Sequence, residues 1–252
     1  MKLTRYGQRG LSLHAHYTYA HATDWNPGES PLNPTGFSRS SQYYGQEYGT
    51  SNQDVRHSAA VMIIYEAPWK LRNLAGRVGN GWMLSGIGQF HSGLPYTMRV
   101  TGSLPEEFDA NGNPIVGLRP GIDGSGGDNR IYWVDSSGNM QTVGRNTFRY
   151  PGTWKADLRL GKKFDLGETR QLEVMAESFN LFNHQNVTEI ETTGYTIESG
   201  SSTSPPTLNF LTGLKTNPKT GLPIPGFGQP LDINGTDFYR ERQIQLGLRM
   251  RF

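Results

Sequence analysis

The sequence has no cysteine, no long run of apolar residues and no excess of charge of one sign. Without cysteine, the chain has neither a disulfide scaffold nor a thiolate metal site. No window approaches the roughly 18 consecutive apolar residues of a membrane-spanning helix, which excludes a bundle of such helices. The formal net charge is +2 over 252 residues. We therefore expect no nucleic-acid partner, because nucleic-acid binders carry a clustered basic face.

What the sequence does contain is a strict alternation of apolar and polar residues between Arg240 and Phe252. A period of two is typical of a β-strand with one apolar side and one wet side. In the closing strand of an outer-membrane barrel, the apolar residues face lipid and the polar residues face a wet lumen. An edge strand of a soluble sheet produces the same alternation, so this stretch alone leaves both interpretations open. The apolar positions are Ile244, Leu246, Leu248, Met250 and Phe252.

Five further segments have strand character, by alternation or by their content of β-branched residues. They are residues 11–21, 55–65, 81–91, 154–164 and 172–177. The connections between the six strands are long, short, long, short and long. In an antiparallel sheet all long connections then lie at one end, which is the loop asymmetry of outer-membrane barrels. The sequence thus predicts an all-β fold, an antiparallel transmembrane β-barrel segment with long extracellular loops and short periplasmic turns. Because about eight strands make the smallest single-chain barrel, we expect these six to belong to a larger one.

Several short motifs follow one another along most of the chain. They are residues 54–57 with 65–68, 81–86 with 92–95, 144–147 with 151–152, 176–184, and 242–248 running to Phe252. Together they resemble the C-terminal barrel of Oar-like TonB-dependent outer-membrane receptors, whose full chains begin with a carboxypeptidase-regulatory-like domain and a plug. The resemblance implies a location in the cell outer membrane. It also implies a plugged barrel of about 22 strands, powered through the inner-membrane TonB complex.

We expect residues 1–252 to form the C-terminal portion of such a receptor barrel. The first ten residues hold no apolar h-region and no small-residue cleavage site. For an exported protein this predicts a piece of a longer reading frame, with leader, regulatory-like domain and plug encoded upstream. By resemblance, the plug and the TonB complex are partners of the barrel.

The resemblance implies TonB-dependent uptake or binding of a large solute, such as an oligosaccharide or a peptide. The alternative is a soluble all-β carbohydrate-binding or structural domain. We expect no enzymatic activity and no cofactor. Asp157 and Glu173 are a conceivable catalytic carboxylate pair, but Lys155 and Arg159 beside them favour the charged forms and oppose the raised pKa of a general acid.

Seven charged residues lie on the polar side of the predicted strands. They either line a solute path or form ion-pair and hydrogen-bond ladders between neighbouring strands and the plug, and we favour the ladders. These lumen-facing candidates are Arg56, Lys155, Asp157, Arg159, Glu173, Glu177 and Arg249.

Aromatic residues are concentrated in the first two long loops. Such side chains stack on sugars, grip peptides or pack on one another. The candidates for ligand contact are Trp25, Tyr43, Tyr44, Tyr48, Tyr132 and Trp133. His14 and His16 share one side of a strand, but no third ligand is evident, so we predict no metal site.

The terminal residue Phe252 ends the alternation on the side expected to face lipid. A terminal aromatic after such a strand resembles the signal read by the barrel assembly machinery. We therefore expect this machinery and outer-membrane lipid as partners. The assembly signal would comprise Ile244, Leu246, Leu248, Met250 and Phe252.

Overall fold

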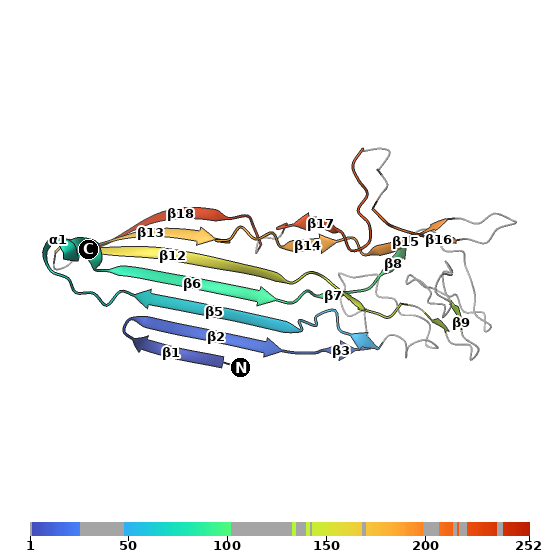
Figure 1. Ribbon diagram of the computed structural model, residues 1–252, viewed down its shortest axis with the longest axis horizontal. Coiled ribbons are helices and arrows are strands. Elements are labelled where there is room, and N and C mark those ends of the chain that lie inside the picture. The colour runs from blue at the N-terminus through green and yellow to red at the C-terminus, as the bar shows by residue number, and fades with distance from the viewer. Residues whose placement is uncertain are drawn as a thin grey trace.

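The computed structural model describes residues 2–25, 48–101, 133–134, 140–141, 143–167, 170–198, 207–213, 216, 221–235 and 239–252. Its main element is a seven-stranded antiparallel sheet whose strands follow one another in chain order (Figure 1). In sheet order the strands are β1 (Lys2–Gln8), β2 (Leu11–Tyr19), β5 (His57–Glu66), β6 (Trp82–His91), β12 (Thr153–Asp165), β13 (Gln171–Phe179) and β18 (Gln243–Arg251). This arrangement confirms the predicted all-β, antiparallel fold. Within the described residues, β1 and β18 are the two edges of the sheet.

The strand register gives the sheet one apolar side. Leu246 of β18 lies opposite Ala176 of β13, and Ala176 lies opposite Leu160 of β12. Leu160 in turn lies opposite Leu84 of β6. Side chains of directly opposed residues point to the same side, so the predicted apolar positions of separate strands join into one continuous surface.

This apolar surface lies on the outside of the sheet. Leu246 is 79% exposed, and Val61 in the middle of β5 is 44% exposed. Among the described residues the buried hydrophobic side chains are Met98 and Ile190, and both lie outside the main sheet. A soluble domain buries its large apolar side chains, so an exposed apolar surface of this extent indicates contact with another apolar phase.

The short connections lie at one end of the sheet, where Figure 1 shows α1 (Asn73–Gly79) beside the C-terminus. Arg9 and Gly10 join β1 to β2 with positive φ angles of 51° and 79°. A Cβ atom on Gly10 would lie 1.9 Å from the carbonyl oxygen of Glu66, so this tight turn requires glycine.

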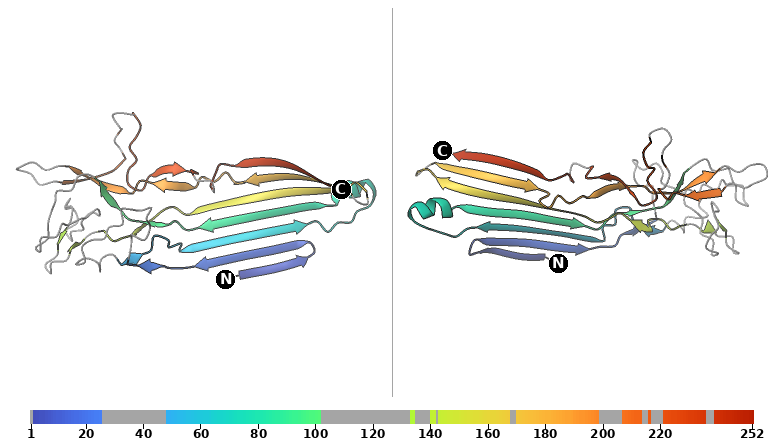
Figure 2. Two further views of the ribbon diagram at one scale, coloured as in Figure 1. Left: turned by 180° about the vertical axis from the view of Figure 1, so that it is seen from behind. Right: turned by 45° about the horizontal axis from the view of Figure 1, so that its top comes forward.

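The long connections lie at the other end and carry small strands, as both views of Figure 2 show. Most of these strands pair two by two, and β15, β16 and β8 form a group of three. They are β3 (Thr23–Asp24), β4 (Gly49–Thr50), β7 (Pro95–Tyr96), β8 (Arg99–Thr101), β9 (Trp133–Val134), β10 (Met140–Gln141), β11 (Phe148–Arg149), β14 (Val187–Ile190), β15 (Thr193–Glu198), β16 (Thr207–Phe210) and β17 (Pro230–Ile233).

Besides the small strands of the long connections, two elements differ from the sequence prediction. The sheet has seven strands instead of the predicted six, and the additional one is β1. The sequence did not reveal β1, because the apolar Leu3 is followed two positions later by Arg5, which breaks the alternation. Residues 66–81, predicted as a plain connection, contain α1, whose glycines and missing side-chain cap weaken the helix signal. In the part of the chain that the structure describes, no helix is long and apolar enough to span a membrane.

Candidate functional site

A ladder of ion pairs crosses the polar side of the sheet from β12 through β13 to β18. Arg159 Nη2 lies 3.6 Å from one carboxylate oxygen of Glu173, and Arg159 Nε lies 3.5 Å from Glu177. Arg249 Nη1 lies 3.9 Å from the other carboxylate oxygen of Glu173. Glu173 is buried, and a buried charge is costly unless it is paired. The two guanidinium groups provide this pairing. Four of the lumen-facing candidates therefore form one network.

Lys155 and Asp157 form a separate pair on β12, with 3.5 Å between Lys155 Nζ and the carboxylate. Asp157 also accepts a hydrogen bond of 2.9 Å from the backbone N–H of Asn180. The Asn180 side chain donates to the carbonyl oxygens of His184 and Arg240, at 2.9 and 2.8 Å. Asn180 thus links the end of β13 to the segment that enters β18. The alternation pattern carries no sign of this junction.

Arg56, the remaining candidate, lies apart from the ladder, where the strands meet the loops. Its guanidinium lies 3.3 Å from Asp54, whose side chain is fully buried. Asp54 also accepts a short hydrogen bond from Arg149 and one of 2.7 Å from the backbone N–H of Ala22. Burial alone would raise the pKa of Asp54, but these hydrogen bonds and the two arginine charges hold that pKa below its usual 3.8. The charged carboxylate therefore ties three segments together.

Arg145 and Asn146 extend this cluster, and both are buried. Arg145 pairs with Asp24 and donates to the carbonyl oxygen of Gly49 at 3.3 Å. Asn146 donates to the carbonyl oxygen of Thr50 at 2.7 Å. The bases of the first two long loops are thereby joined into one platform. We call this platform the rim cluster, and it consists of Asp24, Asp54, Arg56, Arg145, Asn146 and Arg149.

The rim cluster brings together two of the motifs that carry the family resemblance, residues 54–57 and 144–147. Sequence reasoning missed the contact between Asp54 and Arg149, because the two residues are 95 positions apart in the chain. Opposite charges in two distant loops are too common to indicate a pair.

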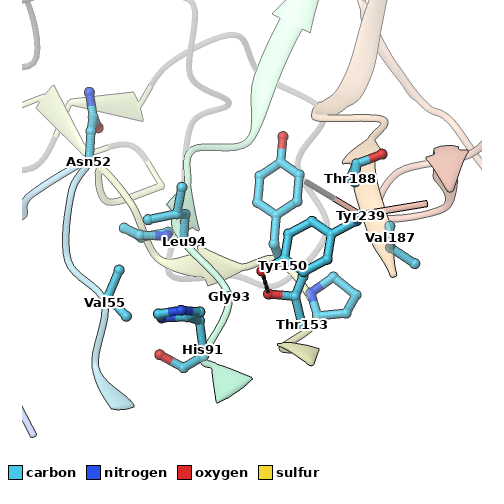
Figure 3. Close-up of a pocket in the computed structure, with 13 residues that line it drawn as sticks. Asn52, Val55, His91, Gly93, Leu94, Tyr150, Thr153, Val187, Thr188 and Tyr239 are labelled. Carbon is cyan, nitrogen blue, oxygen red and sulfur yellow. Dashed lines mark hydrogen bonds between the residues drawn. The ribbon is translucent and has the colours of Figure 1, made fainter. Parts of the chain in front are cut away.

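A cavity of about 470 Å³ opens on the polar side of the sheet beside this platform (Figure 3). Tyr239 lines it and shares a hydrogen bond of 2.7 Å with the Thr153 hydroxyl. Burial and the nearby charge of Glu189 raise the pKa of Tyr150, so this phenol stays neutral at neutral pH. The lining residues are Asn52, Val55, His91, Ser92, Gly93, Leu94, Pro95, Tyr150, Pro151, Thr153, Val187, Thr188 and Tyr239, none of them acidic, lysine or arginine.

A second cavity of about 250 Å³ lies next to Lys155 and Asp157 and is also lined by Tyr239. Tyr150, which lines the first cavity, belongs to an aromatic cluster: the ring of Tyr96 lies 5.3 Å from that of Tyr150 and 5.8 Å from that of Phe227, centroid to centroid. This packing fixes the position of the Tyr150 ring. The arrangement offers aromatic faces and neutral hydroxyl groups, which are typical of a surface that binds sugars.

Two of the loop aromatics predicted to contact a ligand, Trp25 and Tyr48, line neither of these cavities. The rings of Trp25 and Tyr48 are 4.7 Å apart, and the Tyr48 hydroxyl lies 2.9 Å from that of Thr23. About half of each of these two side chains is exposed, although the two rings pack on each other. Tyr43, Tyr44, Tyr132 and the side chain of Trp133 lie outside the described part of the chain.

His14 and His16 lie on the polar side of β2, with 6.3 Å between their ring centroids. No cluster of three or more His, Cys, Asp or Glu residues suited to a metal ion occurs among the described residues. At the other end of the chain Phe252 is 86% exposed, and the four apolar residues before it project from the edge strand β18.

A family model described as an outer membrane beta barrel domain matches residues 1–245. The chain belongs to this family. The barrel domain is therefore an outer-membrane protein, and its exposed apolar surface is the lipid-facing side, as predicted. No curated protein and no solved structure matches the chain.

Membership of this family removes the soluble-domain alternative and assigns an environment to both sides of the sheet. The ladder of ion pairs and both cavities lie on the lumenal side. Short turns are typical of the periplasmic end of such barrels and long loops of the extracellular end. The rim cluster and the cavity of about 470 Å³ accordingly lie near the extracellular mouth.

Proposed function

We propose that the barrel domain is the C-terminal wall of a TonB-dependent receptor that binds and takes up a neutral oligosaccharide. The observation that carries this proposal is the cavity of about 470 Å³ on the lumenal side, which Tyr150, Tyr239 and Thr153 line. Its volume falls within the range of about 300–1,000 Å³ that small-ligand sites occupy. The Oar-like motifs support a receptor of the TonB-dependent class.

The chemistry of the lining favours sugar over charged peptide. Tyrosine faces stack on sugar rings, and hydroxyl groups exchange hydrogen bonds with sugar hydroxyls. A charged peptide entering this cavity would lose hydration without gaining an ionic partner from the lining. The rim cluster beside it keeps the loop bases fixed, which lowers the entropic cost of binding.

We propose a transport role without catalysis. Asp157 is paired with Lys155 and accepts a hydrogen bond from Asn180, and Glu173 lies between Arg159 and Arg249. Both carboxylates are thus engaged in ion pairs between or along strands, which is the ladder role favoured for them. The plug, the TonB complex and the barrel assembly machinery are the protein partners that this role requires.

The test is uptake of fluorescent maltodextrin, with a fluorescent acidic peptide of similar length as comparison, by cells that carry the full-length receptor. We expect maltodextrin uptake to require both the receptor and TonB, and peptide uptake to be weak. Uptake that persists without TonB would contradict the proposed coupling. Preference for the acidic peptide would contradict the assignment of the solute.

The cavity itself is tested by Tyr150→Ala and Tyr239→Ala in the full-length receptor. We expect each change to weaken maltodextrin binding about tenfold, because each removes a stacking face from a buried contact. Tyr19→Ala is the matched control, since Tyr19 lies on the lipid-facing side and is 61% exposed. Its binding should equal that of the wild type.

A further inference from the structure

Among the described strand residues, two cations lie at lipid-facing positions: Arg5 of β1, opposite Leu13, and Lys162 of β12. Lys162 of β12 lies opposite Val174 on one neighbouring strand and opposite Trp82 on the other, so its side chain emerges among the apolar residues. Lysine on this side of a barrel strand is costly except near the interface. Its position therefore needs a compensating partner.

The protein provides part of that compensation. Lys162 is only 5% exposed, and its ammonium donates to the carbonyl oxygens of Val78, at 3.0 Å, and Asn80. The rings of Trp82 and Phe164 lie 5.3 and 5.1 Å from the ammonium, within the range of cation–π contact. No carboxylate of the described residues forms an ion pair with it. The full positive charge is thus solvated by dipoles but not neutralised.

The element that covers Lys162 is the short helix α1. The Trp82 indole N–H donates to the Val78 carbonyl oxygen at 2.8 Å, which holds the end of the helix against the lipid-facing side. The Asn80 side chain closes the segment by two hydrogen bonds to the Leu71 backbone, of 2.8 and 2.9 Å. A Cβ atom on Gly76 would lie 2.2 Å from the Leu71 carbonyl oxygen, so this closure requires a glycine. Residues 71–80 are thus closed by Asn80 and attached to strand β6 through Trp82.

The exposed side chains of this segment fit a membrane interface. Leu74 is 75% exposed, Val78 is 68% exposed and Leu71 is 50% exposed. Arg77 lies in the last turn of the helix. Helices with apolar residues on one side and cations on the other lie at the boundary between headgroups and acyl chains. At the short-turn end of the barrel, this boundary belongs to the inner leaflet.

A groove of about 410 Å³ runs from α1 onto the strands. Its apolar wall includes Leu160, Val174 and Leu246, and the ionisable groups that line it are the two cations Arg77 and Lys162. The ammonium has three donors, and two carbonyl bonds leave one for a ligand. A ligand that fits must carry a negative charge at one end and a hydrocarbon chain at the other.

We propose that this groove binds one anionic phospholipid of the inner leaflet, with its phosphate at Arg77 and Lys162 and an acyl chain along Leu160, Val174 and Leu246. The phosphate neutralises the charge of Lys162, and the chain covers apolar surface that α1 leaves open. The site is independent of the solute that the receptor transports.

The test is native mass spectrometry of the full-length receptor in detergent, titrated with phosphatidylglycerol and, separately, with phosphatidylethanolamine. We expect one phosphatidylglycerol molecule to bind preferentially. Lys162→Met and Arg77→Gln should each lower its affinity about tenfold or more, the value of one charge-assisted hydrogen bond. Lys163→Met is the matched control, because Lys163 is the next residue of β12, faces the lumen opposite Glu173, and should leave binding unchanged.

Two outcomes would overturn the proposal. One is equal phosphatidylglycerol binding by the wild type and by both variants of the groove. The other is displacement of the lipid by inorganic phosphate, which would show an anion site without an acyl-chain site. Arg77 is exposed on α1, so Arg77→Gln tests the site even if Lys162→Met fails to assemble. Assembly of every variant is checked by its migration on gels without boiling.

Discussion

The strands of the barrel domain and the rim cluster are built in opposite ways. The strands expose their apolar residues, with Leu246 at 79% and Leu248 at 76% exposure, and place their ion pairs on the lumenal side. The rim cluster instead buries polar groups: Asp54 is 1% exposed, and Arg145 and Asn146 are 6% exposed. Among the described residues, Lys162 and Glu173 are the buried polar residues of the main strands, and the other buried polar residues lie in the loops.

This difference follows from the surroundings of each region. In the membrane the strands satisfy their backbone groups by pairing, and lipid covers their apolar side chains. Loops in water have neither lipid nor long ladders, so buried charges and amides have to fix their conformation. Adding a charge should therefore destabilise the lipid-facing side of the strands, whereas removing a charge should destabilise the rim cluster.

The largest effect is expected at the end of the strand region, at Phe252. Deletion of Phe252 from the full-length receptor should severely reduce assembly in the outer membrane, with unassembled chain accumulating in the periplasm. The physical reason is loss of the terminal aromatic that we expect the assembly machinery to read. Fractionation of cells followed by immunoblotting measures the result.

The control for Phe252 is Tyr65→Ala, which also removes a lipid-facing aromatic. If Phe252 contributes only contact with lipid, its loss costs about 2 kcal/mol and a large barrel tolerates it. Small and equal effects of the two changes would reject a role in recognition.

In the rim cluster, Asp54→Ala should destabilise the full-length receptor by about 3–5 kcal/mol, because it removes the fully buried carboxylate that pairs with Arg56 and Arg149. The stability is measured by urea-induced unfolding in detergent. Asp165→Ala at the short-turn end is the control, since Asp165 is exposed and bonds only to the Gln171 side chain, at 3.0 Å, among the contacts of the described residues. Its cost should stay within about 0.5 kcal/mol. Similar costs for the two aspartates would contradict the contrast between the regions.

In the strands, Val61→Lys and Met62→Lys separate the two sides of the sheet. Val61 and Met62 are adjacent in β5 and both are 44% exposed, but Val61 faces lipid and Met62 faces the lumen. We expect a loss of about 2–4 kcal/mol for Val61→Lys and less than about 1 kcal/mol for Met62→Lys. Refolding into lipid vesicles at several urea concentrations measures both. A greater cost at Met62 would reverse the assignment of the sides.

The sequence predicts the strands well and the rim cluster poorly, for the same physical reason. Alternation is a local signal: a few residues such as Leu158 and Leu160 reveal which side of β12 meets lipid. The missed strand β1 lacks that signal at Arg5. The rim cluster depends on contacts between Asp54 and Arg149, which local patterns do not encode, and the helix α1 depends on the clamp that Asn80 forms around it. Lys162 is two positions after Leu160 and therefore points to the same side of β12. Extending the alternation of this strand by one step would have predicted a lipid-facing cation.

The smallest effect is expected from pH, and it should appear at the rim cluster. The pKa of Asp54 in the folded protein lies below its usual 3.8, because the Ala22 N–H and the arginines outweigh the effect of burial. The carboxylate therefore contributes stability that is complete well above pH 3.8 and is lost as the pH falls below this value towards the lower folded pKa, at up to about 1.4 kcal/mol per pH unit. Thermal unfolding of the full-length receptor between neutral pH and about pH 3 should show this loss. Asp54→Asn, which cannot ionise, should be less stable at neutral pH and should show a smaller fall in acid. If the variant and the wild type lose stability in parallel, the buried carboxylate is not the group that titrates, and the rim cluster is stabilised by its amides instead.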